Sequence, residues 1–336
     1  MDDSMKEARF WERSGEKVVC HLCPHECTIP PGRRGICGVR ENREGTLMSL
    51  IYGKVSSVNV DPIEKKPLFH FRPGETALSL GTIGCNFRCE HCQNFTISQA
   101  EFQEAHLSEL TPEGVVEMCR REGCGIVAWT YNEPSIWHEF TYDSARATQK
   151  EGISNVYVTN GYLKEDPLRE LSPFLDAMNI DVKAFREDFY RKVCRASLQP
   201  VLDTAELARE LGILIELTYL IIPGQNDSRE EIGEFCRWVA DLDPGVPVHF
   251  TRFHPDYRMR DGVPTPMETM ERAWEVGREV GLEYVYLGNV PMSDRENTYC
   301  PHCGAMVIRR TGFRSRPVGL SEGRCTGCGR ALNIVQ

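Results

Sequence analysis

The stretch "ALSLGTIGCNFRCEHCQN" (residues 77–94) joins a short apolar run to a loop that holds three cysteines within eight residues. The run has the length and composition of a buried strand. Cys85, Cys89 and Cys92 follow it at once. A tetrahedral zinc site takes four ligands and a disulfide takes two, so three thiols on one loop raise the question of what they bind.

The same strand-like pattern recurs along the chain, separated by amphipathic stretches of helical period. The further strand-like runs are residues 125–131, 155–160, 177–183, 214–222, 246–253 and 284–290. The helical stretches are residues 111–122, 135–150, 163–173, 197–211, 228–241 and 265–280. Regular alternation of this kind predicts βαβ units and a parallel sheet. The number of units favours an α/β fold of the partial (β/α)6 barrel type.

Polar residues follow the predicted strands at the points where the strands end. The endings read "CNFRC", "TYNEP", "TNGY", "DVK", "IIPGQND" and "RFHPDY". In α/β barrels the reactive groups gather at the carboxyl ends of the strands. The sequence therefore predicts one functional site built from all of these endings.

The composition excludes several classes of protein. The 336 residues carry a net charge of −10, which argues against a protein that binds nucleic acid by neutralising phosphates. The sequence has no apolar run of membrane-spanning length. Its charged start, "MDDSMKEARFWERSGEK", has no apolar core of a secretory signal. We expect a cytoplasmic protein, in which clustered cysteines indicate metal rather than disulfides.

Eleven of the 15 cysteines fall into three groups. The groups are Cys20, Cys23, Cys27 and Cys37; Cys85, Cys89 and Cys92; and Cys300, Cys303, Cys325 and Cys328. Cys119, Cys124, Cys194 and Cys236 are scattered. We expect three regions: a cysteine-rich N-terminal metal module (1–50), the barrel (51–293) and a C-terminal four-cysteine, zinc-ribbon-like module (294–336).

The two outer groups differ in how well their spacing defines the metal. Two C-x2-C pairs, each followed by glycine, predict a structural zinc site in the C-terminal group, with a rubredoxin-like iron as the alternative. The N-terminal spacing fits zinc or a second iron–sulfur cluster. The turn-rich "PPGRRGICG" slightly favours a structural metal there.

The central C-x3-C-x2-C loop has the spacing to hold three irons of a four-iron cluster and to leave the fourth iron without a protein ligand. An open iron is a reactive iron. The alternative is a zinc ion completed by His91 or by a remote cysteine. His91 lies between two of the cysteines, where the loop would strain to bring all four side chains inward.

"GCNFRCEHCQN" resembles the cluster loop of radical S-adenosylmethionine (SAM) enzymes, and above all that of the pyruvate formate-lyase activating enzymes. With "CHLCPHECTIPPGRRGICGVR" before it and "ENTYCPHCG" after it, the whole chain resembles the radical SAM proteins of the AmmeMemoRadiSam system. The resemblance implies a [4Fe-4S] cluster whose open iron binds SAM. One electron then splits SAM to a 5′-deoxyadenosyl radical, which abstracts hydrogen from a substrate.

The resemblance also implies roles for the residues at the strand ends. Glu133 corresponds to the carboxylate that meets the SAM amino group, although Tyr131 and Asn132 stand in place of the family's two glycines. Thr159 and Asn160 would meet the SAM carboxylate or ribose. In the activating enzymes an aspartate precedes the threonine, where this chain has Val158.

Two further strand endings complete the expected site. Asp181 and Lys183 would lie beside SAM, with a mutual structural ion pair as the alternative. The sixth ending would supply Arg252 to SAM, and His254, Asp256 and Tyr257 to the substrate as catalytic residues. The expected cofactor-binding residues are His91, Asn132, Glu133, Thr159, Asn160, Asp181, Lys183 and Arg252.

The expected partners are a one-electron donor of flavodoxin or ferredoxin type and an unidentified protein or small-molecule substrate. By resemblance, Memo-like and AMMECR-like proteins are candidates. Neither nucleic acid nor membrane is expected as a partner. The competing hypothesis is an iron–sulfur electron carrier or metal-bearing interaction protein that does not cleave SAM.

Overall fold

The computed structural model describes residues 5–102, 105–291 and 293–336. Its centre is an eight-stranded sheet in the order β16-β15-β14-β13-β12-β11-β9-β8, in which all neighbours are parallel except β8 and β9. The strands are β8 (Ser57–Pro62), β9 (Thr76–Gly81), β11 (Ile126–Trp129), β12 (Ser154–Thr159), β13 (Ala177–Asp181), β14 (Leu214–Ile221), β15 (Val248–Arg252) and β16 (Val285–Gly288). The order confirms the predicted α/β fold with a sequentially wound parallel sheet.

Helices connect the parallel strands, as the alternation predicted. They are α2 (Pro112–Glu122), α3 (His138–Gln149), α4 (Glu165–Leu171), α6 (Gln199–Glu210), α7 (Arg229–Leu242) and α8 (Met267–Val280). Thr111 and Ser228 cap two of these helices, each accepting a hydrogen bond from the backbone N–H three residues later. All four residues of β11 are buried, as is typical of a parallel sheet covered on both faces.

Short elements that the sequence pattern did not reveal lie in the connections. They are β7 (Lys54–Val55), β10 (Ser108–Glu109), α1 (Phe95–Ser98), α5 (Glu187–Phe189), the π-helical turn η5 (Tyr190–Cys194) and the 3-10 turns η1 (Ile63–Lys65), η3 (Pro134–Trp137), η4 (Ser172–Phe174) and η6 (Asp294–Glu296). Among the helices that the structure describes, none is long and apolar enough to cross a membrane.

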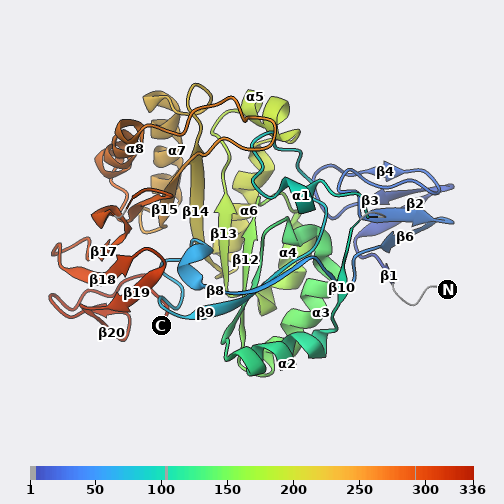
Figure 1. The fold of residues 1–336 in the computed structure, drawn as a ribbon, viewed down its shortest axis with the longest axis horizontal. Coiled ribbons are helices and arrows are strands. Elements are labelled where there is room, and N and C mark those ends of the chain that lie inside the picture. The colour runs from blue at the N-terminus through green and yellow to red at the C-terminus, as the bar shows by residue number, and fades with distance from the viewer. Residues whose placement is uncertain (1–4, 103–104, 292) are drawn as a thin grey trace.

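Small sheets lie at opposite ends of the molecule (Figure 1). The N-terminal strands are β1 (Lys6–Glu7), β2 (Trp11–Ser14), β3 (Lys17–Cys20), β4 (Thr28–Ile29), β5 (Arg40–Arg43) and β6 (Thr46–Ser49). The C-terminal strands are β17 (Thr298–Tyr299), β18 (Met306–Thr311), β19 (Arg314–Pro317), β20 (Leu320–Ser321) and β21 (Arg324–Cys325). Each end therefore forms its own hydrogen-bonded layers outside the central sheet.

Buried polar side chains join the C-terminal strands to the barrel. His70 contacts the carbonyl oxygen of Asn333 through Nδ1 (2.7 Å) and the hydroxyl of Tyr286 through Nε2 (2.8 Å). Because a carbonyl only accepts, Nδ1 of neutral His70 carries the proton and Nε2 accepts from Tyr286. Arg310 of β18 reaches back to the Phe69 carbonyl oxygen (2.7 Å). One histidine thus links the barrel strand β16 to the C-terminal segment.

Stability is expected to fall as the pH falls from 6.5 to 4, partly because of His70. Burial first, opposed by Glu216 and supported by Arg310 and His249, lowers the pKa of His70 from 6.5 to about 4. Between these pH values the unfolded chain binds a proton at His70 that the folded chain does not bind. This difference lowers the free energy of unfolding by about 3 kcal/mol in all. Denaturant unfolding of wild type and His70→Asn between pH 7 and pH 4 gives the free energy of unfolding of each protein at each pH. The contribution of His70 is the difference between the slopes of these two free energies against pH. Equal slopes would contradict it.

Candidate functional site

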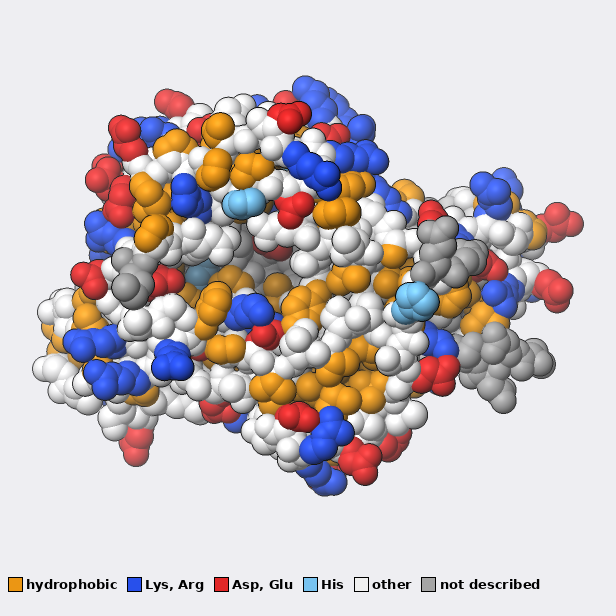
Figure 2. Space-filling view, in the orientation of Figure 1, with side chains coloured by type: hydrophobic (Ala, Val, Ile, Leu, Met, Phe, Trp, Pro, Cys, Tyr) orange, Lys and Arg blue, Asp and Glu red, His pale blue; other side chains and the backbone are white. Residues whose placement is uncertain are grey.

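A cavity of about 780 Å³ opens at the carboxyl ends of the parallel strands. The strand register brings these ends together: Trp129 of β11 lies opposite Leu80 of β9 and Tyr157 of β12, and Thr159 lies opposite Ile180 of β13. Figure 2 shows the molecule hollowed near the centre of this face. The predicted site residues that line the cavity are Cys85, Cys89, His91, Cys92, Asn132, Glu133, Thr159, Asn160, Asp181 and Lys183.

The three-cysteine loop forms one wall of the cavity. The backbone N–H of Phe87 donates to Cys85 Sγ (3.3 Å), and Cys92 Sγ lies 3.2 Å from the hydroxyl of Ser98 in α1. Burial raises the pKa of Cys85 well above its usual value, and Glu133 adds to this rise. Buried thiols in this setting become thiolates only beside a cation. The donor set therefore fits a metal centre at this wall.

His91 is buried on the same wall. Burial, and then Lys183, lowers its pKa to about 3, so its ring is neutral. Its Nδ1 atom is buried without a hydrogen-bond partner in the part of the chain that the structure describes. An unpaired buried ring nitrogen beside three thiols is consistent with a group that fills this wall of the cavity.

Cys194 is a cysteine near the loop whose position the sequence pattern did not reveal. Its carbonyl oxygen accepts a hydrogen bond from the backbone of Arg88 (2.9 Å), and the neighbouring Cys194 thiol raises the pKa of Cys89. Cys194 is fully buried in η5 and is not one of the described residues that line the cavity. It therefore supports Cys89 from behind and leaves the cavity side of the loop free of a fourth thiol.

Glu133 accepts several hydrogen bonds in the segment that follows the second predicted strand. Its Oε1 accepts from Ser135 N (2.9 Å) and from Thr159 Oγ1 (2.7 Å), and its Oε2 accepts from Asn160 N (2.8 Å). Burial raises the pKa of Glu133, while these donors oppose the rise. A carboxylate has about four acceptor sites, so one stays available on the cavity side. Glu133 thus fixes the ending of β12 to that of β11.

Asn132 and Asn160 brace the cysteine loop from two sides. Asn132 donates to the carbonyl oxygen of Gly84 (2.9 Å) and accepts from the backbone of Thr82 (3.1 Å). Asn160 donates to Asn86 Oδ1 (2.8 Å) and approaches Cys85 Sγ (3.8 Å). Both predicted residues therefore line the cavity and also hold the loop in place.

Asp181 and Lys183 form an ion pair at the end of β13, with Nζ and Oδ2 2.7 Å apart. Burial opposes the charge of Lys183, but Asp181 and then Cys89 raise its pKa. The pair is the structural arrangement named above as the alternative, and it also faces the cavity. The pair offers one positive and one negative group to a ligand that carries both charges.

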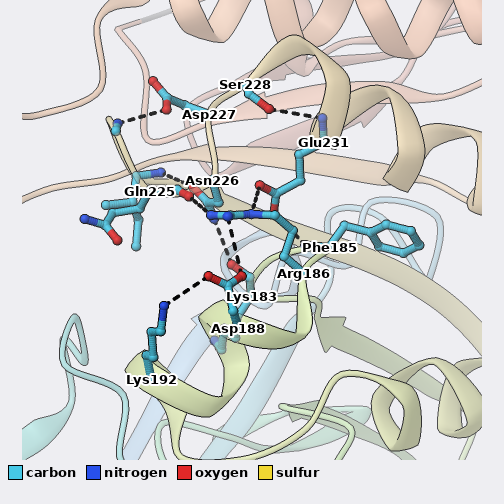
Figure 3. A network of polar contacts seen from close by, with 12 residues as sticks. Lys183, Phe185, Arg186, Asp188, Lys192, Gln225, Asn226, Asp227, Ser228 and Glu231 are labelled. Carbon is cyan, nitrogen blue, oxygen red and sulfur yellow. Dashed lines mark hydrogen bonds and ion pairs between the residues drawn. The ribbon is translucent and has the colours of Figure 1, made fainter.

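The ending "IIPGQND" fixes the backbone beneath this pair. Asn226 Nδ2 donates to the Lys183 carbonyl oxygen (2.8 Å), and Glu231 accepts from Phe185 N and from Arg186 Nε (Figure 3). These contacts tie the segment after β13 to that after β14. The Asn226 side chain is thus a positioning group for Lys183.

The sixth strand ending is arranged differently from the expectation. His249 and Thr251 of β15 line the cavity, whereas Arg252, His254, Asp256 and Tyr257 are absent from the described lining residues. Alternate strand residues face opposite sides. Arg252 therefore points away from His249 and donates to the Thr265 carbonyl oxygen (2.7 Å).

The segment after β15 covers the outside of the cysteine loop. His254 is exposed, and Asp256 accepts from the backbone of Tyr257 in a turn (2.6 Å). The Tyr257 ring stacks on Phe95 of α1 at 4.6 Å, and Arg258 N donates to the Glu90 carbonyl oxygen. The catalytic role expected for this segment has no support from its position.

A charged group outside the predicted site residues also lines the cavity. Lys66 is only 2% exposed and binds Asp61 (2.7 Å), which also accepts from the hydroxyl of Tyr131 (2.6 Å). Asp61 and Lys66 are five residues apart in "DPIEKKP", so helical spacing did not predict that they pair. The sequence also did not predict the position of the Tyr131 hydroxyl, because that residue adopts a positive φ of 75°.

The cavity continues past these charges toward the C-terminal strands. His249 binds the buried carboxylate of Glu216 (2.6 Å), and the cavity wall also includes Phe69, Gly312 and Phe313. The period-2 pattern of β15 was a usable signal for His249. The contribution of the β18–β19 hairpin, which carries Phe313, had no signal in the sequence.

The C-terminal cysteines form a closed metal-binding group. Cys300, Cys303, Cys325 and Cys328 have sulfur atoms that all lie within 4.8 Å of one another. Cys300 and Cys328 are 3.6 Å apart, as are Cys303 and Cys325. Four thiols at this spacing surround one ion and leave it no open position.

The comparisons with known proteins agree with this fold and site. The sequence profile of the radical SAM superfamily matches residues 80–238, which include the cysteine loop and the strand endings up to β14. The uncharacterized protein MJ0808 of Methanocaldococcus jannaschii is 48% identical over 335 residues, or 98% of this chain and 100% of that one. The pyruvate formate-lyase 1-activating enzyme of Escherichia coli K12 is 27% identical over 60% of this chain and 89% of its own length.

A solved structure shares the fold. The radical SAM methyltransferase of Sphaerobacter thermophilus aligns with a TM-score of 0.50 over 70% of this chain and 71% of its own, at 17% identity. The site therefore defines a protein with three cysteines at the carboxyl edge of a parallel α/β sheet. Residues 80–238 form a radical SAM domain, and the chain is related to the pyruvate formate-lyase activating enzymes.

Proposed function

We propose that this chain is a radical SAM enzyme of the activating-enzyme type. Cys85, Cys89 and Cys92 would hold a [4Fe-4S] cluster, and SAM would occupy the adjoining part of the 780 Å³ cavity. The observation that carries the proposal is that three thiols without a fourth share one cavity wall with Glu133 and the Asp181–Lys183 pair. When bound, the cluster and SAM supply a 5′-deoxyadenosyl radical that takes hydrogen from a substrate.

The residues of this chain would bind and orient SAM by charge. Glu133 has a remaining acceptor site on the cavity side, suited to the SAM ammonium group. Lys183 is suited to a carboxylate, and Asp181 keeps it charged until the ligand arrives. Burial of these groups strengthens each contact because little water competes with it.

The cavity leaves room for a substrate beyond SAM. Lys66, His249 and Phe313 line the part of the wall that the cysteine loop does not reach. By analogy with the E. coli relative, whose name states that it activates pyruvate formate-lyase 1, we take a protein as the first substrate candidate. A flavodoxin- or ferredoxin-type donor would supply the electron.

The sequence resemblance to the AmmeMemoRadiSam system adds Memo-like and AMMECR-like proteins as candidate partners. The C-terminal four-cysteine group would hold zinc, since its sulfur spacing of 3.6 Å suits a single tetrahedral ion. The three regions divided at residues 50 and 293 fit this assignment of metal modules around a barrel.

Anaerobic reconstitution tests the proposed reaction. The full chain is loaded with iron and sulfide, reduced with dithionite, mixed with SAM and analysed by chromatography for 5′-deoxyadenosine. Product that depends on the intact cysteine loop supports the proposal. An intact cluster that yields no product would favour an electron carrier instead. Deuterium that moves from a labelled candidate protein into the deoxyadenosine would identify the substrate.

Asp181→Asn is expected to weaken SAM binding about tenfold to a hundredfold without loss of iron. The change removes the charge that holds Lys183 in position, while the cysteine loop keeps its contacts. Isothermal titration of SAM, together with the visible absorbance of the cluster, measures both quantities. Asp188→Asn is the control, because this carboxylate lies at the surface of the same connection. Unchanged affinity would count against the assignment of the SAM site.

A further inference from the structure

The four N-terminal cysteines lie around a void beside the barrel. Cys20, Cys23, Cys27 and Cys37 all line it, together with apolar side chains that include Leu22 and Ile136. These four thiols therefore face one shared void. The sequence left open whether zinc or an iron–sulfur cluster binds here.

The C-terminal group shows the sulfur spacing of a site for a single ion, and the N-terminal group can be compared with it. A tetrahedral zinc ion with Zn–S bonds of about 2.3 Å brings its sulfur ligands to about 3.8 Å from one another. The C-terminal pairs lie at 3.6 Å, and all four of their sulfurs fall within 4.8 Å. Among the residues that the structure describes, no three of the N-terminal sulfurs come that close together. The N-terminal sulfurs are therefore more widely spaced than the C-terminal ones and line a shared void.

The cysteine loop of the radical SAM site shows the same open spacing. Cys85, Cys89 and Cys92 also lie outside the 4.8 Å limit in the part of the chain that the structure describes. The N-terminal set thus resembles the sulfurs that suit a four-iron cluster and differs from those that suit one ion.

A buried cation lies against the N-terminal sulfurs. The Arg40 guanidinium lies 3.7 Å from Cys20 Sγ and forms an ion pair with the buried carboxylate of Glu139. A four-iron cluster with four thiolate ligands is anionic, and a low-dielectric site needs a nearby positive charge to hold it. Arg40 can donate a hydrogen bond to Cys20 Sγ, while its positive charge is shared with Glu139.

The N-terminal void also adjoins the radical SAM loop. Gly84 has a φ of +84°, and a Cβ atom there would lie 2.6 Å from the carbonyl oxygen of Cys37. Gly84 immediately precedes Cys85. His25 Nε2 lies 2.8 Å from the Asn86 carbonyl oxygen, and Arg88 Nη2 donates to the Ile36 carbonyl oxygen. Cys37 therefore packs against the residue directly before the first cysteine of the loop.

The void is close to solvent on its other side. Ile36 lines it and is 44% exposed, and Cys27 is partly exposed. A redox centre here would lie between the surface and the radical SAM loop. Full ligation by four cysteines leaves no iron open to a substrate, which restricts such a cluster to structure or electron transfer, and a position between the surface and the loop favours electron transfer.

We propose that Cys20, Cys23, Cys27 and Cys37 hold a second [4Fe-4S] cluster that passes electrons to the cluster at Cys85, Cys89 and Cys92. The step moves one electron: the N-terminal cluster is oxidised and the loop cluster is reduced, with no bond broken and no proton moved. A low-potential one-electron carrier protein reduces the N-terminal cluster again. The electron-transfer role rests on the proposed function, whereas the presence of the second cluster does not.

Iron and zinc content of the full chain tests the second cluster. After anaerobic reconstitution, wild type is expected to bind about eight irons, and Cys85→Ala/Cys89→Ala/Cys92→Ala about four. This triple variant should show the electron paramagnetic resonance signal of a reduced four-iron cluster after dithionite treatment. Adding Cys23→Ala and Cys27→Ala should remove both the iron and the signal. Cys236→Ala, which removes a buried thiol of α7, is the control and should keep about eight irons.

The proposal is overturned if the triple variant binds no iron. It is equally overturned if the chain carries about one zinc that disappears with Cys23 and Cys27. The triple variant decides the question even if the variant with five substitutions fails to fold, because its N-terminal cysteines are intact.

Reduction kinetics test the electron-transfer role. In Cys23→Ala/Cys27→Ala, we expect 5′-deoxyadenosine formation driven by flavodoxin to fall at least about tenfold, which is about 1.4 kcal/mol in barrier. A single turnover after dithionite reduction should keep its amplitude, because dithionite is small enough to reduce the loop cluster directly. Equal flavodoxin-driven rates would overturn this role. If wild type forms no deoxyadenosine, the proposed function fails, while the iron content still decides whether the second cluster exists.

Discussion

Cys89→Ala is expected to reduce 5′-deoxyadenosine formation to background, a loss of at least about a thousandfold. Cys89 is one of three thiols on the cavity wall, and two remaining sulfurs cannot hold the cluster in one orientation. The C-terminal group lies in a separate small sheet and shares no ligand with this loop. The variant should therefore keep the metal at Cys300, Cys303, Cys325 and Cys328.

Metal analysis and chromatography of SAM products measure both effects in one preparation. Cys194→Ala is the matched control, because it removes the thiol behind Cys89 and leaves the cavity wall complete. It should retain the iron and the reaction. If Cys194→Ala loses the iron instead, the cluster uses a fourth protein ligand and the open iron does not exist. Joint loss of both metals in Cys89→Ala would show that the two sites fold as one unit.

Glu133→Gln is expected to lower the free energy of unfolding by about 2–4 kcal/mol and to weaken SAM binding at least about tenfold. The carboxylate accepts from Ser135, Thr159 and Asn160 in a buried position. A glutamine amide turns its NH2 group toward one of these donors and leaves that donor without an acceptor. The endings of β11 and β12 would then separate, and with them the contacts of Asn160 to the cysteine loop.

Denaturant unfolding and SAM titration check this prediction. Thr159→Val is the graded control, because it removes only one of the three donors and should cost about 1 kcal/mol. The expected order of stability is wild type, Thr159→Val, Glu133→Gln. A Glu133→Gln chain as stable as wild type and with the same SAM affinity would mean that the carboxylate neither joins the strands nor meets the ligand.

The strand endings show how far a linear pattern predicts a site. Cys85, Glu133, Asn160 and Asp181 each follow a parallel strand, and parallel strands end at one edge, so their meeting in one cavity was predictable. The same reasoning predicted Arg252 at the sixth strand, whereas the strand residues among the described cavity lining there are His249 and Thr251. Chemistry-bearing residues occur on both faces of that strand, and only the packing of its neighbours decides which face meets the cavity.

Other parts of the site depend on long-range contacts. Lys66 lines the cavity beside Asp61 of its own segment, and the hydroxyl of Tyr131, 70 residues further along the chain, donates to the same carboxylate. Cys194 reaches Cys89 through η5, a π-helical turn with no periodic signal. Such contacts arise from tertiary packing, which local propensity does not encode.

The sequence by itself determined the sequentially wound parallel sheet and the three-thiol loop at its edge, because hydrophobic period and cysteine spacing are local properties. Only the tertiary structure decided how far apart the sulfurs lie in each cysteine group. Spacing along the chain limits which cysteines can share a metal site. The distances between their sulfur atoms depend on the backbone segments that pack around them. The sulfur spacing distinguishes the closed C-terminal group from the more open N-terminal one.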